Sequence, residues 1–347
     1  MFGLAVESIQ SPTHEGGDDA TVHPKRRSYL YKTLKREGPP MTMEHRIDIE
    51  QNKPERLELL RAQRRFYSRA KNYQNFVAIT ALILPLLVLL FSADFPAIRS
   101  YIGFASIALL LLDVGVLSPK QRACSKAGAK VQEQFDTEVL KLDWNKLVAG
   151  SRVDPEELRA IAPGQISDRE KKGLESWYEG AINRLPLPLG RLLCQRTNVV
   201  YDLRVRRTYS AVLFCIAGVL GVALFAFGLH QGLKLDELII SVGLPVLPMV
   251  SFVLREYRKQ EDTVESLTTL KGEIEKVWEK ALTGASAEEL TLSSRALQDA
   301  IYRHRASNPL VFDWLYNRLR KKSEAQAKHA VEKLVAEAVS KLNLLGV

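Results

Sequence analysis

Four stretches of the chain are almost entirely apolar, and no other feature of the sequence limits its fold as strongly. These blocks one to four are Phe76–Phe91 (extended by Ser92 and Ala93), Tyr101–Leu117, Tyr209–Leu229 and Leu238–Leu254. Each has roughly the 17 to 21 residues with which a helix crosses the ~30 Å hydrocarbon layer of a bilayer. We therefore expect an all-α membrane protein with four transmembrane helices. Buried helices of a water-soluble protein are the alternative.

The blocks are arranged as two hairpins with asymmetric flanks. The loops Ser92–Ser100 and His230–Glu237 are short enough to make neighbouring helices antiparallel, and each carries one base. The four outer flanks are rich in bases, which predicts that both termini and the middle segment face the cytoplasm. These outer bases are Arg61, Arg64, Arg65, Arg69, Lys71, Lys120, Arg122, Lys126, Lys130, Arg196, Arg204, Arg206, Arg207, Arg255, Arg258 and Lys259.

The positions of these bases also explain the net charge of +9. Bases that flank membrane spans orient the chain and contact anionic lipid, so a groove for nucleic acid is the weaker interpretation. We expect the lipid bilayer as a partner, and no DNA or RNA.

The pattern divides the chain into six parts. The predicted parts are a disordered or non-native N-terminal extension (1–40), a cytosolic juxtamembrane helix (41–75), transmembrane hairpin 1 (76–117), a central cytosolic segment (118–208), transmembrane hairpin 2 (209–254) and a C-terminal cytosolic helical region (255–347). A basic tail with its own role, around Lys25–Arg27, is the alternative for the first part.

Helical periodicity and proline positions predict the local structure of the cytosolic parts. A helix over Pro54–Gln74 is expected to continue into block one, and another to cover Ala123–Leu140. Asp154 is an expected N-cap with Pro155 at the first helical position. The proline-spaced run Leu185–Leu189 is expected to be extended, because residues before proline avoid helical backbone angles.

The C-terminal region is also expected to be helical. Block four should continue as a helix through Arg255–Leu282, whose heptad-like apolar positions are interrupted by Lys271. Ser307–Pro309 is interpreted as a helix start. The amphipathic stretch Ala330–Leu345 is expected to pack on the cytosolic domain, and lying on the membrane surface is the alternative.

No pattern for catalysis or metal binding is present in the sequence. The motifs GxxxxGK[ST], GxGxxG, HExxH and GxSxG are absent. Cys124, Cys194 and Cys215 are far apart without a CxxC pair, and the six histidines lack metal-ligand spacing. We expect no enzyme, no catalytic residue, no metal site and no cofactor.

Asp113 is the one ionisable residue inside the blocks. An intramembrane carboxylate can line an ion pathway, which makes Asp113 a pore-lining candidate. The alternative is that it lies one turn from the cytosolic end of block two and pairs with Lys120 or with lipid-facing bases. Four mostly apolar helices offer almost no polar lining, so a conducting pore would require a homo-oligomer or rearranged spans.

Four motifs in the polar stretches carry a family resemblance. They are Ala62-Gln63-Arg64 with Tyr67–Lys71; Gln134–Thr137 with Trp144-Asn145; Leu185–Leu189 with Cys194–Asn198 and Tyr201-Asp202; and Ile301-Tyr302 with Arg305–Pro309 and Asp313–Tyr316. In this order, with four spans in a 2 + 2 layout, the chain resembles the S-4TM family of pore-forming effectors. The resemblance covers about residues 50 to 325. It implies that proteins of the family start at a position near Met41 or Met43, so residues 1–40 depart from the family pattern.

The resemblance implies a bacterial inner-membrane effector of antiphage defence. In such systems a partner nucleotidyltransferase makes a cyclic nucleotide on infection, and the effector senses it and damages the membrane, which stops the infected cell. A constitutive channel or transporter, and a membrane scaffold that recruits a cytosolic partner, remain as alternatives.

The activating nucleotide would be an anion bound in the cytosolic domain. Guanidinium groups suit phosphate, and an indole can stack on a base. The candidate residues are Arg196, Asn198 and Arg207 near block three, and Arg303, Arg305, Asn308 and Trp314 in the C-terminal motif. Contact of the arginines with lipid headgroups, and a core position for Trp314, are the alternatives.

Overall fold

The computed structural model describes residues 46–91, 95, 97–230, 232 and 234–342. All regular structure in this part of the chain is helical, which confirms the predicted all-α class. The predicted extension 1–40, with Met41 and Met43 after it, lies outside the described residues.

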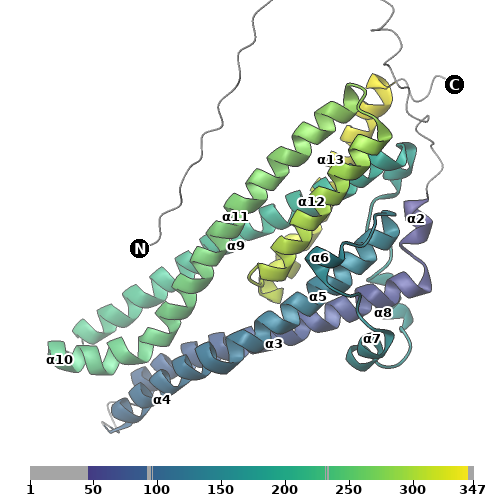
Figure 1. Cartoon of the computed structure of the whole chain (residues 1–347). Coiled ribbons are helices and arrows are strands. Elements are labelled where there is room, and N and C mark those ends of the chain that lie inside the picture. Colours follow the sequence, from purple (N-terminus) through teal and green to yellow (C-terminus); the bar gives the residue numbers. More distant parts are fainter. Residues whose placement is uncertain (1–45, 92–94, 96, 231, 233, 343–347) are drawn as a thin grey trace, which may run out of the picture. The chain divides into compact units, whose positions relative to one another are not determined.

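The first apolar hairpin belongs to two long helical segments. The short α2 (Ile47–Glu50) precedes α3 (Pro54–Phe91), which runs without a break into block one, as predicted. The return segment consists of α4 (Ile98–Leu112), the π-helical turn η1 (Asp113–Leu117) and α5 (Ser118–Val139). α3 packs against α4 at the apolar end and against α5 in the polar part (Figure 1).

Short helices with local caps follow α5. They are α6 (Lys146–Ala149), α7 (Pro155–Ile161), α8 (Asp168–Lys172) and the 3-10 turn η2 (Gly180–Arg184). Asp154 and Pro155 occupy the predicted N-cap and first positions of α7, although the Asp154 side chain makes no cap hydrogen bond. A reciprocal capping box of Ser167 and Glu170 starts α8, which satisfies backbone donors that the helix leaves free.

One helix, α9 (Leu187–His230), contains all of block three and a polar stretch of more than 20 residues before it. The predicted extended run Leu185–Leu189 is wrong beyond Pro186, because the helix already begins at Leu187. Pro188 is then the second residue of α9, and a proline in the first turn removes no helical hydrogen bond.

Block four is divided over three elements. They are α10 (Leu235–Leu238), the π-helical turn η3 (Ile239–Gly243) and α11 (Leu244–Leu282). α11 continues block four as one helix through Leu282, as predicted, and packs along α9 (Figure 1). It is followed by Gly284, whose φ of +98° is a backbone angle that favours glycine.

The last two helices are α12 (Ala287–Ser307) and α13 (Asp313–Lys341). The interpretation of Ser307–Pro309 as a helix start is wrong. α12 ends there with Asn308 as its C-cap, because the residue before Pro309 is driven to extended backbone angles. α13 buries Val331, Val335 and Ala338 in the main core, so the described part of this stretch, up to Leu342, packs on the other polar helices.

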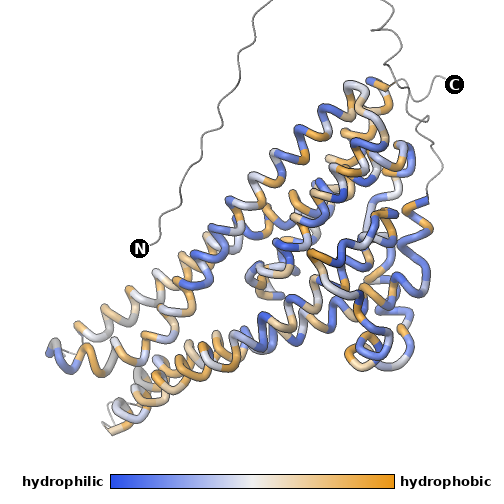
Figure 2. The backbone as a smooth tube through the Cα atoms, viewed as in Figure 1, coloured by the Kyte–Doolittle hydropathy of each residue, from blue (hydrophilic) through white to orange (hydrophobic). Residues whose placement is uncertain are grey.

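The main core lies among the polar helices, in a unit that we call the helical unit (46–75, 118–208 and 255–342). Phe135, Leu193, Ile274 and Val335 are fully buried in it. The blocks have only a small cluster of their own, in which Met249 joins residues of blocks one and two. Most residues of the blocks are hydrophobic, as the orange stretches of α3, α4, α9 and α11 show, whereas the turn at α10 is blue (Figure 2).

Large exposed apolar side chains concentrate in the blocks. Phe104 is 75% exposed, Val222 70% and Val219 69%. Within the described residues, two helices are long and apolar enough to cross a membrane, over Ser100–Val139 and Leu187–His230. A water-soluble fold rarely leaves so continuous an apolar surface in contact with water.

Candidate functional site

A buried ion pair between α5 and α12 is the centre of the most polar region in the helical unit. Asp136 on α5 is completely buried and pairs with Arg305 on α12. The hydroxyl of Tyr178 donates to Asp136 Oδ1 at 2.7 Å and accepts from Asn198 Nδ2 at 3.1 Å. Gln298 Nε2 donates to Asp136 Oδ2 at 3.2 Å. The Asp136 carboxylate therefore joins α5 to α12 and to the loop that carries Tyr178, and Tyr178 extends the network to Asn198 on α9.

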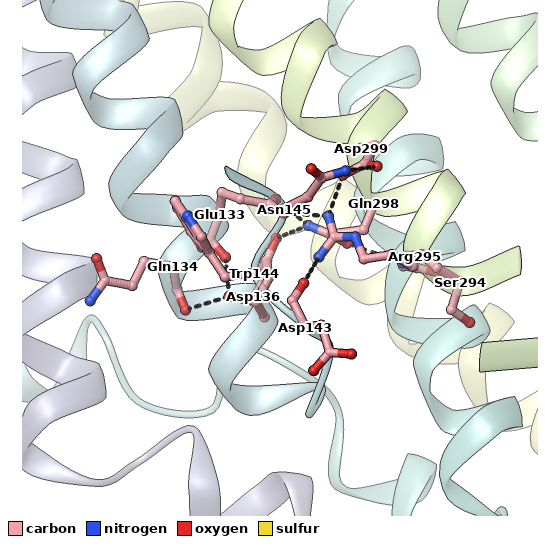
Figure 3. Close-up of polar contacts among 12 residues, drawn as sticks. Glu133, Gln134, Asp136, Asp143, Trp144, Asn145, Ser294, Arg295, Gln298 and Asp299 are labelled. Carbon is pink, nitrogen blue, oxygen red and sulfur yellow. Dashed lines mark hydrogen bonds and ion pairs between the residues drawn. The ribbon is translucent and has the colours of Figure 1, made fainter. Parts of the chain in front are cut away.

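A second buried carboxylate extends this network along the same two helices. Glu133, three residues before Asp136 and therefore on the same helix face, accepts from Arg295 and Gln298 at 2.7 and 2.8 Å. Arg295 also pairs with Asp299, and its Nη1 donates to the backbone carbonyl of Asp143 at 2.7 Å. Figure 3 shows these side chains converging on Arg295. The network is thus a continuous polar layer inside an otherwise apolar core.

Burial changes the protonation of these groups. Desolvation raises the pKa of Glu133 to about 7, and the hydrogen bonds from Arg295 and Gln298 only partly oppose it. Burial also raises the pKa of the Tyr178 hydroxyl well above its usual range, and the neighbouring Asp136 charge adds to that effect. Tyr178 therefore remains a donor at neutral pH, which keeps its bond to Asp136.

The pKa of Glu133 predicts a pH-dependent stability. Between its ordinary value of 4.5 and about 7, the folded state holds a proton that the unfolded state has lost. The retained proton stabilises the folded state by at most about 3 kcal/mol. This contribution is fully present below pH 4.5 and is lost as the pH rises through about 7. The free energy of unfolding should fall from about pH 5 to about pH 8 more steeply for the natural protein than for Glu133→Gln. Equal slopes in denaturant titrations of the two proteins would contradict this.

The linker between α12 and α13 is a second polar junction, and we call residues 308–312 the linker. Its carbonyls accept hydrogen bonds from three helices that continue into the blocks. Arg206 on α9 donates to the Pro309 carbonyl at 2.7 Å. Gln260 on α11 and Gln74 on α3 donate to the Leu310 carbonyl at 3.4 and 3.3 Å. The linker therefore joins the C-terminal helices to the ends of blocks one, three and four that adjoin the main core.

Side chains around the linker strengthen this junction. Both Asp202 oxygens lie 2.9 Å from Arg206 Nε, and Asn308 Nδ2 donates to Asp202 at 3.4 Å. The ring of Phe312 packs against Tyr209 at the start of block three and against Phe252 near the end of block four. A movement of the linker would therefore change its contacts with α9 and α11.

Asp113, the pore-lining candidate, is 4% exposed and begins the π-helical turn η1. Its carboxylate pairs with Arg255 on α11 and accepts from the Ser118 hydroxyl at 2.8 Å. The contact links the second helix of hairpin 1 to the helix that leaves hairpin 2. Its partner is Arg255 and not Lys120.

The first predicted ligand cluster is partly brought together on one seam between α9 and α11. Arg196 lies 3.1 Å from Glu275, which also pairs with Lys271 at 3.2 Å. Arg207, about 16 Å further along α9, donates to the Thr268 hydroxyl at 3.2 Å. Two bases, Arg196 and Lys271, therefore share the Glu275 carboxylate, and Arg207 makes no ion pair with any described residue. Asn198 points elsewhere, to Tyr178 in the buried network.

The second predicted cluster does not form one site. Arg305 is held by Asp136 inside the core, and Asn308 caps α12 and contacts Asp202. Arg303 and Trp314 are exposed, and Trp314 retains 54% of its surface. Arg305 and Asn308 therefore have internal partners that a ligand would have to replace.

The residues that sequence reasoning missed are the acidic and tyrosine partners of these bases. Asp136 and Asp202 lie inside the motifs that carry the family resemblance, but they were not proposed as partners of arginine. Tyr178 lies outside those motifs. The available signal was the presence of one acid and one arginine in different motifs, since buried charges are almost always paired.

Metal binding has no support from the described part of the chain, where no group of three or more histidine, cysteine, aspartate or glutamate side chains could hold an ion. The polar layer is instead saturated with arginine and amide partners. Its chemistry is that of structural ion pairs.

Comparison with known proteins agrees with this architecture. The SMODS-associating 4TM effector domain matches residues 45–334. A probable CBASS effector molecule of Bacillus cereus (strain VD146) is 27% identical over 275 residues, which are 77% of this chain and 90% of that protein. No solved structure gives a significant match. The family and the two apolar helices indicate a membrane protein. The chain belongs to the SMODS-associating 4TM effector family.

Proposed function

We propose that this protein is an antiphage effector that forms pores in, or disrupts, the bacterial inner membrane when its helical unit binds a cyclic nucleotide. Blocks one to four are its four spans, in two hairpins, with both termini and residues 118–208 in the cytoplasm. The nucleotide is the product of a partner nucleotidyltransferase. The active form is a homo-oligomer, because four apolar helices lack a polar lining for a pore.

The observation that carries this proposal is the contrast between the two ends of the same helices. α3, α9 and α11 are each continuous from the packed helical unit into an exposed apolar block. A bilayer is the solvent that accepts such side chains, and it accepts a backbone only when every polar group is satisfied, as in a helix. The family match and the probable CBASS effector among its relatives support the defence role.

The α9–α11 seam is the proposed nucleotide site. Arg196 and Lys271 share the single carboxylate of Glu275, and Arg207, further along α9, contacts only the Thr268 hydroxyl among the described side chains. Glu275 is 40% exposed, so phosphate can replace it as the partner of Arg196 at little desolvation cost. The buried pair of Arg305 and Asp136 offers no such surplus.

The linker is the proposed connection between the seam and the spans. The nucleotide would contact α9 and α11, and both helices donate to linker carbonyls before they enter blocks three and four. A ligand shifts such an equilibrium only if it binds the open state better than the closed one. Phosphate that draws Arg196 away from Glu275 would change how α9 and α11 pack, and this supplies a difference between the two states.

Dye leakage from liposomes that contain the full-length protein tests the proposed function. Leakage should begin on addition of one member of a panel of synthetic cyclic dinucleotides and trinucleotides, and linear nucleotides serve as the control. Leakage without any nucleotide would indicate a constitutive channel. No leakage with any member of the panel, from protein shown to be inserted, would overturn the proposal in favour of a scaffold.

Substitutions on the seam should reduce nucleotide affinity and leave insertion intact. We expect Arg196→Ala to weaken binding by about 10-fold or more, because a hydrogen bond to a charged group contributes about 1.5 to 3 kcal/mol. Arg207→Ala should act in the same direction. The matched control is Arg303→Ala, which removes an exposed arginine of α12. Calorimetric titration that finds the loss in Arg303→Ala instead would move the site to the C-terminal motif.

A further inference from the structure

We propose that the start of α13 and the exposed bases beside the blocks form a surface that binds the headgroups of anionic phospholipids, with Trp314 as its anchor in the bilayer interface. This surface consists of Trp314, Arg69, Lys120, Arg258 and Arg318. It acts without nucleotide and is therefore separate from the proposed signalling site, with which it shares only the insertion of the blocks.

The contacts of its two neighbours place Trp314 at the level where the blocks begin. Asp313 pairs with Lys71 at 2.5 Å, five residues before block one. Leu315 is buried in a cluster with Tyr209 and Leu213, the first turns of block three. Trp314 lies between these two fixed residues and is 54% exposed. An exposed indole at this depth matches the amphipathic belt that tryptophan forms at membrane surfaces.

The four bases of this surface lie on four different helices, close to the same ends of the blocks as Trp314. Arg69 precedes block one by seven residues, Lys120 follows block two by three and Arg258 follows block four by four, so all three are within about 11 Å of a block along a helix axis. Arg318 lies one turn after Trp314 on the same face of α13. All four are exposed, and none makes an ion pair with any described residue.

This combination points to lipid phosphate rather than to another ligand. Long basic side chains can cover apolar surface while their charges reach headgroup phosphates. Each base near an anionic surface adds attraction that fades within a Debye length, so bases this close to the blocks are placed to use it. An indole that stacked on a nucleotide would gain nothing from a position beside the first turns of a span.

Quenching of tryptophan fluorescence tests the inference on the full-length protein. The protein is reconstituted without nucleotide in vesicles of phosphatidylcholine and phosphatidylglycerol, the latter dibrominated near the headgroup end of its acyl chains. We expect the bromine to quench Trp314, and Trp314→Phe to lose most of this quenching. Trp144, Trp177 and Trp278, which lie in the helical unit, supply the remaining emission.

Anionic-lipid preference supplies the second measurement. Arg258→Gln and Arg318→Gln should each weaken retention of phosphatidylglycerol over phosphatidylcholine in detergent-purified protein by about fivefold. The control is Lys276→Gln, which is exposed on α11 about 33 Å beyond block four. Equal quenching in Trp314→Phe, or equal loss in the control, would overturn the inference. Protein that fails to resist carbonate extraction would instead overturn the membrane insertion that the proposed function requires.

Discussion

Replacing Asp136 by alanine should destabilise the helical unit by about 3 to 5 kcal/mol, because it leaves Arg305 charged and without its partner in the core. Arg305 keeps only 13% of its side-chain surface, so water cannot replace the carboxylate. The change also removes the acceptor of the Tyr178 hydroxyl and of Gln298. Thermal unfolding of the full-length protein in detergent, followed by near-ultraviolet circular dichroism, measures the loss.

Two further variants separate the charge from the packing at this site. Asp136→Asn should lose nearly as much as alanine, since the Arg305 charge remains. Adding Arg305→Gln to Asp136→Asn should recover part of the loss, because removing both charges leaves no unpaired ion. Asp262→Ala, at an exposed position of α11, should change stability by less than about 0.5 kcal/mol. A loss below about 1 kcal/mol for Asp136→Ala would show that the pair does not hold the core together.

Placing arginine at Val219 should reduce membrane insertion of the second hairpin by about a hundredfold. Val219 is near the middle of block three and is 69% exposed. On the surface of a water-soluble protein this change would be nearly neutral, whereas arginine at the centre of a membrane span costs about 2.5 to 3.5 kcal/mol. The fraction that resists alkaline extraction from membranes measures the difference.

Leu147 provides the matched control for Val219→Arg. It is 99% exposed on α6, outside the blocks, so Leu147→Arg should leave the inserted fraction unchanged. If the fraction of Val219→Arg that resists extraction equals that of the natural protein, block three does not lie in lipid. Both Val219 and Leu147 are exposed apolar side chains. They are predicted to differ only in their surroundings, which are lipid for Val219 and water for Leu147.

The sequence was most informative where one residue type dominates a long stretch. The helix from Pro54 into block one and the helix from block four to Leu282 were both predicted, because a continuous apolar or heptad-like pattern permits little else. The predictions of helix boundaries were wrong at two prolines. The starts and ends of α9 and α12 depend on whether Pro188 and Pro309 sit inside a first turn or beyond a last one, and spacing alone does not distinguish these positions.

The helical class and the separation of apolar blocks from charged segments could be predicted from the sequence, because both follow from local composition and period. The role of each charged group became clear only from the packing of the helices. Arg305 and Arg196 are both arginines near predicted sites, yet one is buried against Asp136 and the other shares Glu275 at the surface. That difference arises from contacts between residues far apart in the sequence: Arg196 and Glu275 are separated by 79 positions, and Arg305 and Asp136 by 169. Such pairing depends on how helices pack, which local sequence does not specify.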